Sequence, residues 1–287
     1  MAAAAESRLP RWLIRISYPI AALVLTLVFI VIGFPYDRLA VRLGQELEST
    51  LGMRLRIGEI SPHLGLGGLG IVVREVLAKP EDSPTIVIQE VVVRPAWSLA
   101  WFRGRPAIRL DIASEMGDAS GTLIAGNTGP WQGQLKAVQL DALPLEMIQA
   151  LNMDGSLDAT FDLRRAPQEQ GGQLEGLMDF ELRDGSFSSE GLPLALPLER
   201  LEGHLIFGGE SFVTLSDVAL EGPLLEGTLQ GGVGHARTLA NQSLAIDLSF
   251  RVRDESLAGL MNGMSNPGDD GFHRLQVTGT IAKPTIR

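Results

Sequence analysis

Apolar and polar residues alternate one by one over most of this chain, which is the pattern of a β-strand with one buried face. The alternation is clearest in residues 157–163, 178–183, 244–252 and 274–281. Strands of this kind are expected in an antiparallel sheet that is solvated on one side. The sequence therefore predicts a mainly β domain, and the residues that we expect in its apolar interior include Phe161, Met178, Phe180, Leu182, Ile246, Leu248, Phe250 and Val277.

Glycine recurs inside these strands in a short repeat. Leu-Glu-Gly begins at Leu174, Leu201, Leu220 and Leu225, usually with another apolar residue two positions after the glycine. A glycine on the apolar face of a strand removes bulk and marks a bend or a close approach of backbones. We therefore expect a curled, mostly antiparallel and half-open sheet of about fourteen strands, stacked over roughly 65 Å at ~4.8 Å per strand.

One segment, residues 16–34, has no alternation and no charged residue. At about 1.5 Å per residue, a helix of this length covers the roughly 30 Å hydrocarbon core of a bilayer. A cleaved signal peptide would have a shorter apolar core and a small-residue cleavage site, and a buried core helix would keep a polar face. We predict a transmembrane anchor, whose apolar residues include Ile16, Ile20, Leu23, Leu25, Leu27, Phe29, Ile30, Ile32 and Phe34.

Arginines flank this segment equally, three before it in residues 1–15 and three after it in residues 35–54. Because long domains cross a membrane largely regardless of charge, we expect residues 1–15 to be a cytoplasmic tail and residues 53–287 to lie outside the cytoplasm. The chain carries −10 and its first 34 residues carry +2, so the remainder carries −12. A domain this acidic repels nucleic acid and gains nothing from anionic lipid headgroups.

Helices are predicted in only a few other places. Residues 35–52 have leucines every four positions and are expected to form an amphipathic stalk helix, with a partner-binding helix as the alternative. Residues 97–102, 145–151 and 256–264 predict three short helices, which must pack against the sheet to be stable.

No motif in the sequence predicts catalysis, a metal site or a cofactor. Residues 65–70 match G-x-G-x-x-G, but a dinucleotide site needs a helix next, and the following residues are typical of a strand. The four histidines are far apart in sequence, and we expect all of them to be solvated. The acidic residues alternate along the strands, as on a solvated face. We therefore expect a protein that is not an enzyme.

An aromatic and basic cluster lies within residues 97–105. Trp97 and Trp101 are four residues apart, and Arg103 and Arg105 come directly after Phe102. Such a cluster forms either a lid on one end of the apolar groove or a contact with a partner or a membrane surface, where Trp and Arg are enriched.

The order of these features resembles the N subunit family of bacterial type II secretion systems, in the form that is similar to AsmA-like and TamB-like proteins. The resemblance extends over nearly the whole chain and is carried by residues 34–37, 52–57, 61–62, 71–73, 97–104 and 277–284. It implies a non-enzymatic accessory protein of the inner membrane, with an AsmA-like β groove in the periplasm and other secretion components, of the inner membrane or the secretin, as partners. The alternative is a lipid-handling envelope protein whose groove holds the acyl chains of phospholipids, because the closing phrase Gly279-Thr280-Ile281 with Pro284 occurs across the wider AsmA-like group.

Overall fold

A computed structural model describes most of the chain after residue 53. The residues described are 54–65, 68–79, 85–97, 104–125, 129–143, 153–167, 173–188, 195–236, 241–254, 267–281 and 283–286, with scattered helical positions between residues 18 and 45.

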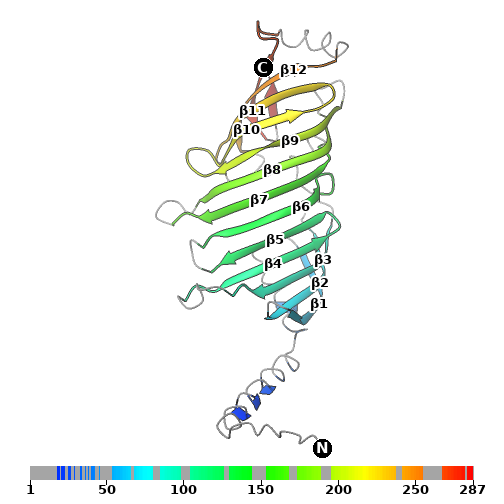
Figure 1. The fold of residues 1–287 in the computed structure, drawn as a ribbon, viewed down its shortest axis with the longest axis vertical. Helices are drawn as coiled ribbons and strands as arrows, with labels where there is room; N and C mark the ends of the chain where they lie inside the picture. Colours follow the sequence, from blue (N-terminus) through cyan, green and yellow to red (C-terminus); the bar gives the residue numbers. More distant parts are fainter. Residues whose placement is uncertain are drawn as a thin grey trace, which may run out of the picture.

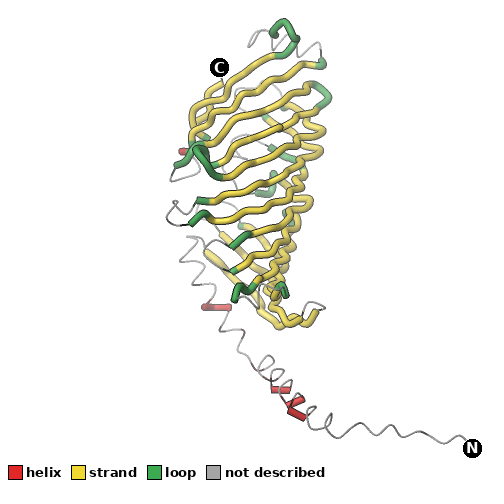
Figure 2. The backbone as a smooth tube through the Cα atoms, turned by 60° about the vertical axis from the view of Figure 1, so that its left-hand side comes forward, coloured by secondary structure: helices red, strands yellow, loops and turns green. Residues whose placement is uncertain are grey.

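The described part of the domain is one antiparallel sheet of fourteen strands (Figure 1). Each strand pairs with the next one in the chain, so the sheet is an up-and-down meander, and its end strands do not pair with each other. The turned view in Figure 2 shows that the sheet is twisted and bowed rather than flat. The mainly β, antiparallel prediction is confirmed. The strands are β1 (Arg54–Gly65), β2 (Gly68–Lys79), β3 (Ile86–Pro95), β4 (Ala107–Ser114), β5 (Gly117–Ile124), β6 (Trp131–Gln139), β7 (Ser156–Arg165), β8 (Leu174–Phe187), β9 (Leu196–Phe207), β10 (Val213–Glu221), β11 (Leu225–Val233), β12 (Ser243–Val252), β13 (His273–Thr280) and β14 (Lys283–Ile286).

Strict alternation fails at three points within strands, one of which lies between Ile88 and Glu90 of β3. The register also shifts between Leu135 and Val138 in β6, and between Leu215 and Val218 in β10. Ala137 and Asp217 lie at these two shifts with φ of 49° and 52°, a left-handed backbone that L-residues rarely adopt. Each is a β-bulge, which adds one residue to a strand and increases its bend and twist.

The predicted helices fall mostly outside the described residues. Among the described residues, no helix has the length and hydropathy to cross a membrane. Of the nine anchor residues, only Leu25 and Phe29 are described, and both are helical and exposed. The predicted helices over residues 145–151 and 256–264 lie outside the described residues. Trp97, the first residue of the predicted helix over residues 97–102, is described and is not helical.

The G-x-G-x-x-G segment lies at the β1–β2 connection. Gly65 ends β1 and Gly68 begins β2, so a strand follows the glycines where a dinucleotide site would need a helix. Leu69 and Gly70 also belong to β2, and residues 66 and 67, where the loop is predicted, lie outside the described residues.

Candidate functional site

The register aligns the apolar side chains of successive strands on one face of the sheet, which we name the apolar face. A single row of cross-strand neighbours runs over thirteen strands without a polar residue, and we name it the central row. From β1 to β13 it consists of Ile60, Val73, Val91, Ile112, Ala119, Leu135, Ala159, Phe180, Gly203, Val218, Leu229, Leu248 and Leu275.

The eight residues predicted for the interior all lie on this face. Phe180 and Leu248 belong to the central row, and a parallel row contains Phe161, Met178, Ile246 and Val277. Leu182 and Phe250 lie on the other side of the central row. Leu182 and Phe250 are buried, with 2% and 3% exposure, whereas the other six are only half-buried. The structure therefore brings the eight residues together on one face and leaves most of them partly open to solvent.

The glycines of the Leu-Glu-Gly repeat lie on the apolar face in three of four cases. Gly176, Gly203 and Gly227 pair across strands with Leu163, Phe180 and Phe250. A Cβ atom at Gly203 would lie 2.7 Å from the Cα atom of Val218, and a Cβ at Gly227 would lie 2.5 Å from the carbonyl oxygen of Ser249. The predicted close approach at these glycines is confirmed.

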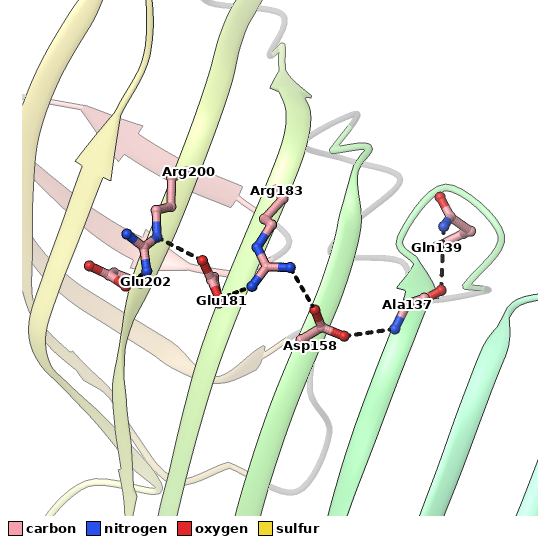
Figure 3. Close-up of polar contacts among 7 residues, drawn as sticks. All are labelled: Ala137, Gln139, Asp158, Glu181, Arg183, Arg200 and Glu202. Atoms are coloured by element: carbon pink, nitrogen blue, oxygen red, sulfur yellow. Dashed lines mark hydrogen bonds and ion pairs between the residues drawn. The ribbon is translucent and has the colours of Figure 1, made fainter.

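The sheet curls toward its apolar face near its C-terminal end. Leu196 of β9 packs against Phe250 of β12, although two strands lie between them. In a flat sheet, strands three positions apart are separated by roughly 14 Å, too far for two side chains to meet over the face. In Figure 3, the strands near the C-terminus pass behind β8 and β9, on the side away from the ion pairs. The apolar face is therefore the concave face in this region.

The opposite face, which we name the polar face, is laced with ion pairs (Figure 3). Asp158 accepts hydrogen bonds from the Ala137 backbone at 2.9 Å and from Arg183 at 3.3 Å. Arg183 also donates to Glu181, whose second oxygen lies 2.7 Å from the Nε atom of Arg200. The hydrogen bond from Arg183, more than the charge of Arg183 and of Arg200, lowers the pKa of Glu181.

A shallow depression of about 530 Å³ lies beside these ion pairs, between β6, β7 and β8. Its carboxylates are already engaged: Asp158 and Glu181 bind arginines, and Asp179 lies 2.5 Å from the Nδ1 atom of His204. In the part of the chain that the structure describes, no group of three or more His, Cys, Asp or Glu residues is arranged to hold a metal ion. The carboxylates at this depression are thus paired with basic side chains, and no described element forms a layer over the apolar face.

The prediction for the histidines was wrong at one position. His204 and His235 are exposed, but His273 is 4% exposed and stacks on the Phe250 ring, with centroids 5.3 Å apart and planes at 17°. His273 has the same strand parity as Leu275, so alternation places its ring on the apolar face.

The apolar face ends in an exposed row at one long edge of the sheet. Ile108, Leu123 and Trp131 are cross-strand neighbours at the ends of β4, β5 and β6, with exposures of 37%, 40% and 42%. Leu69, at the start of β2, is 43% exposed, and Trp97 is 67% exposed beside Gly68 of the β1–β2 connection. We name these five residues the apolar lip. Sequence reasoning found only Trp97 of this set.

The rest of the predicted aromatic and basic cluster is only partly described. Trp101, Phe102 and Arg103 lie outside the described residues, and Arg105 is exposed. Trp97 and Arg105 lie between β3 and β4 and are therefore at the same edge as the rest of the apolar lip.

Comparison of this chain with family models, with curated proteins and with solved structures gave no match.

Proposed function

We propose that this protein is a non-enzymatic accessory component of the bacterial type II secretion system, and that its apolar face holds an apolar segment of another envelope molecule. In this proposal the anchor at residues 16–34 sits in the inner membrane and the sheet lies in the periplasm. The secretion assignment draws on the resemblance of the quoted sequence phrases, and the binding role draws on the geometry of the sheet.

The central row is the observation that carries the binding role. It presents apolar side chains over thirteen strands, and no described element covers it. Nine of its thirteen residues are only half-buried, and a long, partly open apolar surface of this kind is an aggregation hazard unless it has an occupant. On the polar face, ion pairs already join β7, β8 and β9, so we place the occupant on the apolar face.

A second candidate is transfer of phospholipid, and one feature of the same face favours it. The central row offers no side-chain hydrogen-bond donor or acceptor, and His273 at its margin is stacked on Phe250. An acyl chain needs no hydrogen bonds, whereas a polypeptide brings backbone groups that lose their water when they are buried.

Two measurements separate these roles. Deleting the gene lowers the abundance of secreted proteins under the secretion proposal, and an unchanged secreted proteome contradicts that proposal. Native mass spectrometry of the full chain, extracted gently from membranes, reports bound phospholipid under the second candidate. Met178 and Leu177 are neighbours that lie on opposite faces. If bound phospholipid is lost in a Met178→Asp variant and kept in a Leu177→Asp variant, the phospholipid is bound on the apolar face.

A further inference from the structure

The edge that carries the apolar lip also has an unusual distribution of charge. Its strand ends and connections occupy residues 60–73, 93–110 and 119–135, which contain Arg94, Arg103, Arg105 and Arg109 and no Asp or Glu. The opposite edge of the same strands, in residues 54–59, 74–92, 111–118 and 136–143, has both signs of charge, with nine Asp or Glu residues and five Lys or Arg residues. The domain after the anchor therefore has a cationic edge although its net charge is −12.

Two arginines at this edge face each other across neighbouring strands. Arg94 of β3 and Arg109 of β4 are direct cross-strand partners, an arrangement that like charges disfavour. Both bind the same carboxylate, Asp111, at 2.8 Å and 3.2 Å. One carboxylate for two guanidinium groups leaves an excess of one positive charge, and the exposed Arg105 adds a second.

Apolar side chains, tryptophan and arginine together are the combination that binds the interface of an anionic membrane. Tryptophan partitions to the headgroup level, apolar side chains enter the acyl boundary, and arginine pairs with phosphate. This edge has all three, because the lip places one exposed apolar residue on each of β2, β4, β5 and β6 and the arginines lie on the same strand ends and connections. At ~4.8 Å per strand, these residues extend over roughly 20 Å in a line.

We propose that the apolar lip, together with the exposed Arg105 and with Arg94 and Arg109 on the opposite face of the same strand ends, docks this edge of the first six strands on the surface of an anionic phospholipid bilayer. This inference concerns the edge of the sheet and does not depend on what occupies the apolar face. The predicted anchor ends at Phe34, twenty residues before β1, so the same bilayer is within reach.

A protein partner fits this edge less well. Protein interfaces typically combine both signs of charge at a polar rim with about one hydrogen bond per 100–200 Å². The edge segments carry charge of one sign only, and the five lip side chains offer no polar atoms apart from the indole N–H groups of Trp97 and Trp131. A bilayer surface requires no matching set of hydrogen bonds.

The sequence contains no cysteine, so single labels can be placed without removing native thiols. The test uses the full chain, reconstituted in vesicles rich in phosphatidylglycerol, with a fluorophore at Ile108→Cys or Leu123→Cys. Control labels at Leu177→Cys and Ile206→Cys have similar exposures, 42% and 43%, but lie on the polar face of β8 and β9. Quenching by a lipid that carries a nitroxide at its headgroup measures contact with the membrane surface.

We expect severalfold stronger quenching at Ile108→Cys and Leu123→Cys than at the two controls, and weaker quenching in phosphatidylcholine vesicles. Arg105→Gln should lower the ratio of docked to undocked molecules about fivefold, because each arginine near an anionic surface contributes on this order. Arg105 is exposed, so this variant keeps the fold, which circular dichroism verifies. Equal quenching at all four positions, or lip labels shielded only when an acidic protein is added, would overturn the proposal.

Discussion

Single glycines set how closely neighbouring strands approach on the apolar face. Gly176 has φ of 140°, and a Cβ atom there would lie 2.1 Å from the carbonyl oxygen of Asp162. Gly209, in the β9–β10 connection, also has a positive φ, 82°, but nothing lies within 4 Å of its Cβ position. The two residues share an unusual backbone conformation and differ in the space around them.

Gly176→Ala should therefore destabilise the domain by more than about 2 kcal/mol, since overpacking adds to backbone strain. Gly209→Ala should cost about 1 kcal/mol from strain alone. Thermal unfolding of the detergent-solubilised chain measures both. If the two variants lost the same stability, the close approach of strands would not be the reason that position 176 requires glycine.

Neighbouring positions on β8 report which face is apolar. Phe180 lies in the central row, whereas Leu177 lies on the polar face and is 42% exposed. Phe180→Asp should destabilise by about 2–4 kcal/mol because it places a charge among apolar side chains. Leu177→Asp should change the stability by less than about 0.5 kcal/mol. Near-neutral effects at Phe180 would show that the assignment of the faces is inverted.

The ion pairs of the polar face predict a specific response to acid. Arg183 lowers the pKa of Glu181 chiefly by its hydrogen bond, and Arg274 does the same for the pKa of Asp270. A carboxyl whose pKa is lower in the folded state stabilises the fold above its unfolded pKa, and this contribution is lost as the pH falls through the folded value. In a carboxyl-carbon NMR titration, Arg183→Gln should raise the pKa of Glu181 and leave that of Asp270 unchanged. Arg274→Gln should do the reverse.

At the scale of the strand, β-bulges decide which side chains share a face. In β10, Leu215 and Val218 both point to the apolar face because Asp217 adds one residue between them. Val218 is 1% exposed and lies against Gly203, so the bulge fills the central row at a point where β9 has no side chain.

The bulge predicts that glycine and valine substitutions have opposite orders of stability at Asp217 and at Asp247. At Asp217, with φ of 52°, glycine should be neutral or stabilising by up to about 1 kcal/mol, and valine should destabilise. At Asp247, in the regular part of β12, valine should be better tolerated than glycine because β-branched residues favour strands. Urea titration of the four variants measures the order. The same order at both sites would rule out strain at Asp217.

The sequence was sufficient for the elements with uninterrupted alternation, such as β7 and β12, and for the faces of their side chains. It was insufficient at the bulges, because a period of two assumes that no residue is inserted. The available signal was a polar pair inside an apolar strand, such as Ser216-Asp217 in β10. His273 was assigned by residue type, although its parity with Leu275 placed it on the apolar face.

The apolar lip could not be predicted from alternation alone. Whether Ile108, Leu123 and Trp131 are exposed depends on how neighbouring connections close over the strand ends, which is a tertiary property. The next residue of the same cross-strand row, Leu163 of β7, is buried, with 6% exposure. The absence of acidic residues from the three edge segments was visible in the sequence and would have indicated a distinct surface.

At the scale of the molecule, the described strands form an open sheet with two unlike faces. The polar face pairs its own charges across strands, and pairs this exposed contribute little to stability. The apolar face presents a row of apolar residues over thirteen strands, with Gly203 as the one position that has no side chain, and it curls inward where Leu196 meets Phe250. This asymmetry is the basis for placing an apolar occupant on the concave face and for treating the lip as a separate surface.

Photo-crosslinking from matched neighbours tests this asymmetry most directly. A photoreactive residue is placed in the full chain, in its own cells, at Met178 or Leu205 on the apolar face and at Leu177 or Ile206 on the polar face. We predict that Met178 and Leu205 capture an apolar molecule, either an acyl chain or an apolar segment of a secretion component, and that Leu177 and Ile206 do not. Capture at Leu177 and Ile206 alone, or equal capture at all four positions, would contradict an occupied apolar face.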